Sequence, residues 1–405
     1  MDGVAAHHRF ELRAPTARWL AWAVVLAGVF AWGLYAFSLQ IRHGLSVTNL
    51  RTIGSGGASW GLYIVFDVVF IGVSFAGITI ASLVRLFGIR PLRPLARMAE
   101  LLTIIALILG AFSVMADLGR PGQGLINFPR FARPTSPFFG TFTMVVGGYL
   151  FASLVYFYLA GRADAAALAE RPGPFRWAYR IWASGYRGSR AELARHRIGS
   201  FWLSLFILPL LVTAHSTLGF VFGLQGGRPG WFSALQAPNF VVTAAVSGIG
   251  VLIVIAAAIR RILSLERHIE PAAFQWLGNL LWILIFVALY FIGTEELTAS
   301  YAAGAKDREF AHMMISGSYR GLFALEVGAL VAAFAILFGL FARRRVSIAW
   351  TVVAALVVNV GAVLKRYLLV VPSQTHGMLL PYPEGHYRPS WVELSVIAGL
   401  IAFGI

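Results

Sequence analysis

The sequence predicts an all-α polytopic membrane protein with about ten transmembrane helices. Hydrophobic residues make up 59% of the 405-residue chain and charged residues only 12%. The apolar residues also gather in long runs, and a run of about 20 is enough for a helix to cross a bilayer. Together with a mean hydropathy of +0.76, this pattern argues against an ordinary soluble domain.

Ten apolar runs define the expected spans, of which the last is the shortest. The intervening segments are rich in arginine, glycine and proline, as expected of loops at the membrane surface. The runs cover residues 19–41, 60–84, 98–118, 136–160, 198–223, 239–263, 274–295, 320–342, 346–371 and 391–405.

Lysine and arginine are distributed unequally between the two sides of these spans. The N-terminal segment 1–18, the loops after spans 2, 4, 6 and 8 and the last residues of span 6 hold 21 of the 33 basic residues. The positive-inside rule places these loops and both termini in the cytoplasm, and the loop 372–390 outside. The same rule accounts for the net charge of +16 without a nucleic-acid partner. We therefore predict a multi-pass protein of the cytoplasmic (inner) membrane.

The loop after span 4, residues 161–197, carries eight of the arginines. It is either an amphipathic helix lying on the membrane surface or a solvated basic loop, and the sequence favours neither.

Charged side chains within or next to the spans lie almost entirely in the outer half of the predicted membrane. A charge in hydrocarbon costs several kcal/mol by most scales, so such groups usually face a bundle interior, where they pair or relay protons. The candidates are Asp67, Asp117, His215, Glu295, Glu296, Glu326, Lys365, Arg366 and Glu393.

Several of these charges have a purely structural interpretation. Asp117 and Arg120 could form an ion pair that closes the loop between spans 3 and 4. Lys365 and Arg366 could extend to the membrane interface, which we favour over a catalytic role. The glutamates early in spans 8 and 10 lie near enough to the interface to be solvated.

His215 is the only one of nine histidines that lies well inside a predicted span. A lone buried histidine is often a packing residue, but this one shares its depth with carboxylates. Its imidazole could donate a hydrogen bond to a quinone carbonyl and pass on a proton, which Asp117 or Asp67 would exchange with the outer aqueous phase. A single histidine cannot supply both axial ligands of a b-type haem, and without cysteine no iron–sulfur cluster is expected. We predict no haem, cluster or other metal in this chain.

Aromatic residues mark the start of span 2. Trp60, Tyr63 and Asp67 recur at about one helical turn and would share a face. The alternative is that Trp60 and Tyr63 belong to the aromatic belt at the membrane surface.

Four stretches of the chain together resemble the NrfD/PsrC family, the membrane subunits of polysulfide reductase-like complexes. The resemblance extends over about residues 49–400 and points to the ten-span branch that includes alternative complex III. The stretches are NLRTIGSGGASWGLYIVFDVVFIGVSFAG, ADLGRPGQGLINFPRFARPTSPFFGTF, TAHSTLGFVFGLQGGRPGWFSALQAPNFVVTAAVSG and YPEGHYRPSWVEL.

The resemblance implies two four-helix bundles, residues 60–223 and 239–371, flanked by a peripheral first span and the last span. It also implies a quinone (menaquinone or ubiquinone) as substrate, bound in the outer half of the first bundle. One departure affects this assignment, because Phe232 stands where many relatives have histidine after the tryptophan. The expected quinone-site residues are His215, Asp117, Asp67, Trp60, Tyr63 and Arg120, of which His215 and Asp117 would be catalytic.

The second bundle resembles the one for which a proton path has been proposed in some relatives. The residues expected on such a path are Glu295, Glu296, Glu326, Lys365 and Arg366.

The predicted function is therefore the quinone-reactive membrane subunit of a multisubunit respiratory oxidoreductase, inactive alone. By resemblance its partners are a ferredoxin-like iron–sulfur subunit on the outer face and, in some assemblies, molybdopterin or multihaem cytochrome subunits. The alternatives are a structural anchor without a quinone site and, less favoured, a secondary transporter. Transporters place broken spans and charges at the midplane, whereas here the charges lie in the outer half.

Overall fold

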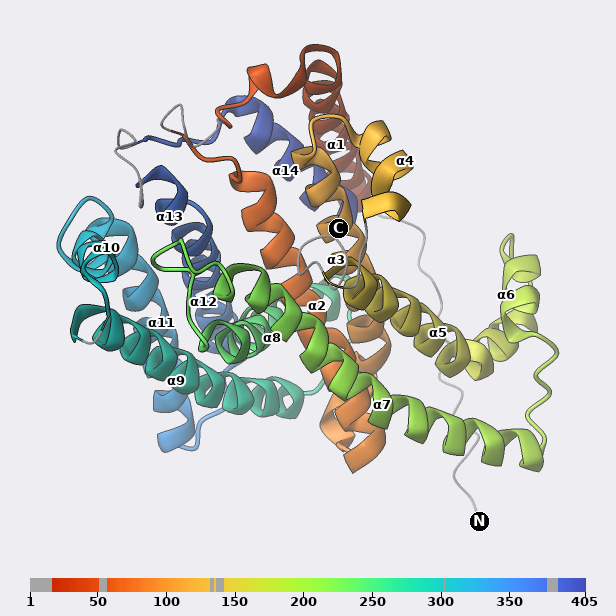
Figure 1. Ribbon diagram of the computed structural model, residues 1–405. Helices are drawn as coiled ribbons and strands as arrows, with labels where there is room; N and C mark the ends of the chain where they lie inside the picture. Colours follow the sequence, from red (N-terminus) through yellow and green to blue (C-terminus); the bar gives the residue numbers. More distant parts are fainter. Residues whose placement is uncertain (1–16, 51–56, 132–134, 136–141, 302, 377–384) are drawn as a thin grey trace.

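The computed structural model describes residues 17–50, 57–131, 135, 142–301, 303–376 and 385–405, which form helices and no strand (Figure 1). The N-terminal segment 1–16 and much of the loop 372–390 lie outside the described residues. The helices are α1 (Ala17–His43), η1 (Gly44–Val47), α2 (Leu62–Phe87), η3 (Arg90–Leu95), α3 (Ala96–Asp117), α4 (Pro121–Phe131), α5 (Phe142–Ala169), α6 (Arg176–Ala183), α7 (Arg190–Gly223), α8 (Gln236–Ile262), α9 (Pro271–Tyr301), α10 (Ala305–Ile315), α11 (Arg320–Ala342), α12 (Ile348–Val370), α13 (Pro372–Thr375) and α14 (Trp391–Gly404).

The predicted fold class is confirmed. Within the described residues, nine helices are long and apolar enough to cross a membrane, and the tenth predicted span is the shorter apolar helix α14. The chain is therefore an integral membrane protein. The loop expected at residues 161–197 is shorter than predicted, because α5 continues to Ala169 and α7 already begins at Arg190. Between them lies the short helix α6, which leaves Trp177 and Ile181 exposed.

Helix α2 is the most deeply buried span and lies at the centre of the molecule (Figure 1). It packs against α3, α7, α8 and α12. Its approach to α3 depends on Gly77, since a Cβ there would clash with the carbonyl oxygen of Ala99. Small residues allow this close packing between apolar helices, which have little hydrophobic driving force to associate in lipid.

Two groups of helices meet along α2. Helices α3, α5 and α7 pack around one side of it, while α8, α9, α11 and α12 pack with one another and reach α2 through α8 and α12. One hydrophobic core runs through both groups. Helices α1 and α14 pair at the periphery, where Gly33 and Gly399 bring their backbones together.

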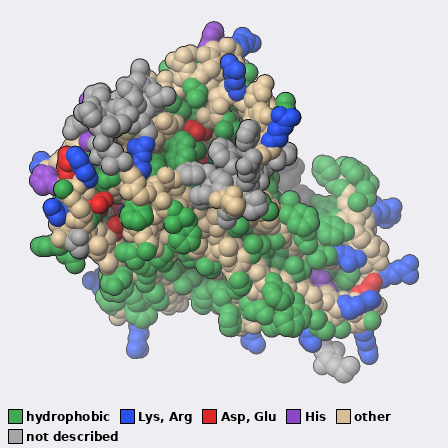
Figure 2. Space-filling view, in the orientation of Figure 1, with side chains coloured by type: hydrophobic (Ala, Val, Ile, Leu, Met, Phe, Trp, Pro, Cys, Tyr) green, Lys and Arg blue, Asp and Glu red, His purple; other side chains and the backbone are tan. Residues whose placement is uncertain are grey.

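The surface agrees with a membrane-embedded body. Figure 2 shows hydrophobic side chains over a broad band of the visible face, with lysine and arginine side chains at its margins and around the projecting α6. Exposed apolar residues along α1, α3, α5, α7, α9, α11 and α12 provide the surface that lipid contact requires.

Candidate functional site

A hydrogen-bonded group of polar side chains lies at the N-terminal end of α2. The Tyr63 hydroxyl donates to Gln40 Oε1 of α1 at 2.7 Å, and Gln40 Nε2 donates to the carbonyl of Ala116 on α3 at 2.6 Å. Ser113 of α3 donates to the Tyr63 carbonyl at 2.7 Å. Tyr63 and Gln40 are fully buried. These bonds join α1, α2 and α3 close to the candidate carboxylates Asp67 and Asp117.

Two of those carboxylates lie beside this group. Asp67 is one turn after Tyr63 and only 3% exposed, and Asp117 is the last residue of α3. Asp67 and Asp117 interact electrostatically with each other, and Tyr63 interacts with Asp117. In each carboxyl group Oδ1 is buried and has no hydrogen-bond partner among the described residues. A buried polar atom without a partner is costly, so these oxygens are available to a hydrogen-bond donor from a ligand.

A third carboxylate completes the group. Glu393 interacts electrostatically with Asp117, and its own oxygens accept from the Tyr387 hydroxyl at 2.5 Å and the Ser390 N–H at 2.9 Å. It is completely buried, so the expectation of a solvated carboxylate here was wrong: the residue caps α14 and faces inward. Burial and the neighbouring Glu393 raise the pKa of Tyr387. We call Gln40, Tyr63, Asp67, Asp117, Tyr387 and Glu393 the tyrosine–carboxylate cluster.

Trp60 does not share a helical face with Tyr63 and Asp67, because α2 begins only at Leu62. Its ring stacks on Trp231 at 5.7 Å between centroids and meets Phe222 edge-on at 5.9 Å. The Gln374 side chain holds the Trp60 backbone by two hydrogen bonds. It accepts from the Trp60 N–H at 3.0 Å and donates to the Trp60 carbonyl at 2.9 Å. Trp60 therefore contacts α7 and the α7–α8 connection, whereas Tyr63 points to α1.

His215 lies between helices rather than beside Asp117. Its Nδ1 is 2.9 Å from the carbonyl oxygen of Leu211, and its Nε2 is 2.9 Å from that of Ile71 on α2. The rings of Phe75 and Tyr149 flank it, and it is 1% exposed. The imidazole therefore lies between α7 and α2 one turn from Asp67, with a backbone carbonyl oxygen beside each nitrogen, of which a neutral ring can donate to one.

Arg120 is exposed at the start of α4, and among the described ion pairs none joins it to Asp117. The ion pair considered from the sequence is therefore absent from the described part of the structure. The reason is local: the chain turns after Asp117, with Gly119 at φ +66°, and this turn precedes the arginine.

A second buried polar group lies among α8, α9, α11 and α12. Lys365 Nζ is 3.2 Å from Glu295 Oε2, and both side chains are largely buried. Gln236 donates to Glu295 Oε1 at 2.8 Å. Lys365 also interacts electrostatically with Glu326 and Glu296. The structure thus gathers three carboxylates around one ammonium group.

Arg366 extends this group toward α8. Its guanidinium donates to Thr243 Oγ1 at 2.6 Å and lies over the Phe240 ring at 4.4 Å. It is 4% exposed, so the favoured interpretation of Lys365 and Arg366 as interface-seeking side chains was wrong. Glu326 is also buried rather than solvated, and its Oε1 has no partner among the described residues. We call Glu295, Glu296, Glu326, Lys365 and Arg366 the lysine–glutamate cluster.

Sequence reasoning missed several neutral side chains that hydrogen-bond to the two clusters. Gln40 and Ser113 on one side, and Gln236 and Thr243 on the other, supply hydrogen bonds that position the charged groups. The sequence did carry a signal for them. An uncharged polar residue in an apolar span finds no hydrogen-bond partner in lipid, so it is expected to bond to another part of the protein. Among the described residues, no three histidine or acidic side chains gather as metal ligands would.

Comparison with known proteins gives a consistent picture. The family described as "Polysulphide reductase, NrfD" matches residues 52–376. A putative dimethyl sulfoxide reductase membrane subunit of Halobacterium salinarum is 32% identical over 284 residues, 69% of this chain and 61% of that protein. A selenate reductase subunit of Mesobacillus selenatarsenatis is 23% identical over 94% of this chain and 90% of its own length.

A further relative has a quinol in its name. The Hdr-like menaquinol oxidoreductase integral membrane subunit of Archaeoglobus fulgidus is 23% identical over 97% of this chain and 92% of its own length.

Proposed function

The chain belongs to the polysulphide reductase NrfD family, and from this premise we propose that it is the quinone-reactive membrane subunit of a multisubunit oxidoreductase. The observation that carries the proposal is the tyrosine–carboxylate cluster, where Asp67 and Asp117 each leave a buried oxygen without a partner among the described residues. The reductase-subunit names of two relatives, and the menaquinol in the name of a third, support the same assignment.

The cluster has the groups that quinone chemistry needs from a protein. Oxidation of a quinol releases two protons and two electrons, and reduction of a quinone takes up the same number. We assign the protons to Asp67 and Asp117, which would hydrogen-bond the quinol hydroxyls and exchange protons with the outer aqueous phase. The electrons pass to or from an iron–sulfur partner on the outer face, beside η1 and α4. The redox change takes place on the quinone itself.

His215 takes a different role in this proposal from the one expected of it. Both of its ring nitrogens lie at backbone carbonyls, so we assign it to positioning α7 against α2 rather than to contact with the quinone. Gln40 and Tyr63 hold α1 and α3 around the same site.

The test is quinol turnover and quinone-analogue binding by the purified complex. Asp67→Asn and Asp117→Asn should each lower turnover by about 100-fold or more, as loss of a general acid–base does. Asp307→Asn, on α10 outside the cluster, is the control and should leave turnover unchanged. His215→Gln should weaken binding of the analogue more than it lowers kcat.

The alternative is a structural anchor without a quinone site, which the position of His215 between two backbone carbonyls favours. It predicts full turnover in both aspartate variants with the complex still assembled, and that result would refute the proposed site.

We further propose that the lysine–glutamate cluster carries protons through the second group of helices. Three carboxylates around Lys365 could pass a proton between them with little change in net charge. Glu326→Gln should therefore keep quinol turnover but lower the number of protons moved per electron in sealed vesicles. An unchanged number of protons moved per electron would show that the lysine–glutamate cluster is not part of the proton path.

A further inference from the structure

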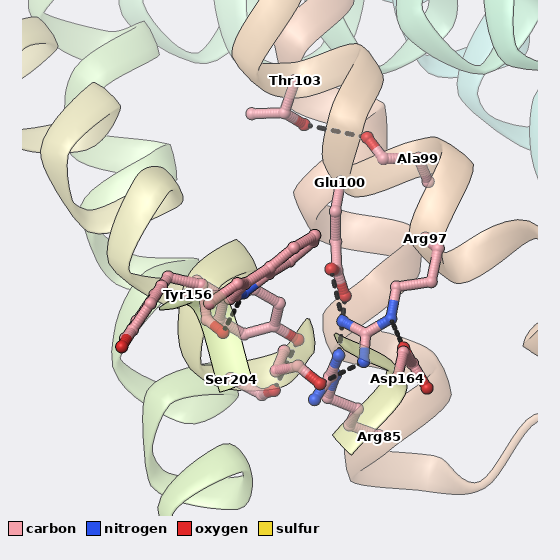
Figure 3. A network of polar contacts seen from close by, with 11 residues as sticks. Arg85, Arg97, Ala99, Glu100, Thr103, Tyr156, Asp164 and Ser204 are labelled. Atoms are coloured by element: carbon pink, nitrogen blue, oxygen red, sulfur yellow. Dashed lines mark hydrogen bonds and ion pairs between the residues drawn. The ribbon is translucent and has the colours of Figure 1, made fainter. Parts of the chain in front are cut away.

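A charged network lies at the arginine-rich end of α2, α3 and α5, opposite the tyrosine–carboxylate cluster (Figure 3). Glu100 is completely buried and accepts from Arg85 and from Arg97, each at 2.7 Å. Arg97 also donates to Asp164 at 2.8 Å and to the carbonyl of Ala160. The function proposed above uses none of these groups.

A cavity of about 570 Å³ opens beside this network, between the end of α2 and the first half of α7. One part of its wall is basic and hydroxylic, and the other is apolar and aromatic. The lining residues are Arg85, His196, Arg197, Ile198, Ser200, Phe201 and Trp202.

The charges around the cavity do not balance. Glu100 and Asp164 are the acidic groups, and Arg97 contacts both of them. Arg85 and Arg162 interact electrostatically with His196 at the cavity wall, and Arg197 adds a further cation. The arginines therefore outnumber the carboxylates by two. In addition, Arg85 Nε is buried and has no hydrogen-bond partner among the described residues.

We propose that this cavity binds the phosphate group of an anionic phospholipid. An excess of guanidinium charge with an unused buried donor fits a phosphate, which arginine recognises through several N–H groups at once. The basic half of the wall holds the phosphate, and Ser200 offers a further hydroxyl donor.

The apolar half of the wall indicates a lipid rather than free phosphate. Ile198, Phe201 and Trp202 are 58%, 44% and 50% exposed, and the apolar surface continues along α7 to Phe206 at 67%. Side chains of this kind would contact acyl chains and the glycerol region. The cavity lies where α2 ends in arginine, which is where the headgroups of the basic side of the membrane would be.

The experiment titrates the purified full-length protein in detergent with phosphatidylglycerol and counts bound lipid by native mass spectrometry. Arg197→Glu places a negative charge in the wall and should weaken binding by about 30-fold, the effect of a two-unit change in charge. Arg195→Glu is the matched control, because Arg195 lies on the same helix but does not line the cavity. It should bind phosphatidylglycerol like the wild type.

Three results would overturn the proposal. Equal weakening by Arg195→Glu would mean that only general surface charge attracts the lipid. Equal retention of phosphatidylcholine with the same acyl chains would remove the requirement for net negative charge. Displacement of the lipid by millimolar inorganic phosphate would assign the cavity to a soluble anion. Because both variants keep the Arg85–Glu100 pair, unaltered thermal unfolding serves as the check on folding.

Discussion

The two buried polar clusters differ in how their charges are compensated. In the lysine–glutamate cluster, Glu295 has an ammonium partner and an amide donor, so the charge of this carboxylate is compensated inside the protein. In the tyrosine–carboxylate cluster, Asp67 and Asp117 interact with each other and with Glu393, and none of the described ion pairs involves either aspartate. Internal compensation suits a group that holds or relays protons. Carboxylates whose charge is incompletely compensated suit a site that binds a hydrogen-bonding ligand.

The largest expected effect follows from removing the ammonium partner of Glu295. Lys365→Met leaves Glu295 buried without its partner and should lower the free energy of unfolding by about 3–5 kcal/mol. The measurement is denaturant unfolding in mixed micelles, with the exposed Lys306→Met as control. A loss below about 1 kcal/mol would show that the pair is solvated. The two clusters would then not differ in how their charges are compensated.

The next effect tests the close packing of α2 against α3. Gly77→Ala would force α2 away from the Ala99 carbonyl on α3 and should cost about 1–3 kcal/mol. Gly147→Ala on α5 meets no atom within 4 Å and should change stability by less than about 1 kcal/mol. Equal effects in the same unfolding assay would mean that the close approach of α2 and α3 contributes little.

A similar or slightly smaller loss is expected from Tyr63→Phe. This change leaves Gln40 Oε1 buried without its donor, which should cost about 1–2 kcal/mol. Tyr35→Phe, on the exposed face of α1, provides the matched comparison. Identical melting temperatures for Tyr63→Phe and the wild type would show that the hydroxyl is dispensable for joining α1 to α2.

The smallest effect concerns an ion pair outside the spans. A hydrogen bond from Lys306 and the charge of its ammonium lower the pKa of Glu309 on α10. A lowered pKa stabilises the folded state above the ordinary pKa of glutamate, and this stabilisation is lost as pH falls through the lowered value. Because both side chains are exposed, Glu309→Gln should cost at most about 0.5 kcal/mol at neutral pH. Unfolding measured at neutral and at acidic pH should show the difference disappear in acid, and a larger or pH-independent loss would contradict this account.

Much of the candidate chemistry could be found from residue type alone. Charged residues in apolar spans are few, so Asp67, Asp117 and the members of the lysine–glutamate cluster stood out directly. Their partners could not be assigned in this way. Lys365 lies 70 positions from Glu295 along the chain, and only the packing of α12 against α9 brings them to 3.2 Å. For the same reason the sequence could not show that Lys365 and Arg366 turn inward, since a long basic side chain near a helix end can point either way.

The spans, and therefore the class of fold, follow from the amino-acid sequence alone, because the transfer of each apolar run into lipid depends on that run's own composition and length. The sequence also determined which residues would be too costly to leave facing lipid. Which helices those residues join depends on how the helices pack in three dimensions. His215 binds the backbone of α2 instead of meeting Asp117, and Tyr63 reaches Gln40 of α1. These choices depend on contacts between segments far apart in the chain, and no local property of either segment specifies them.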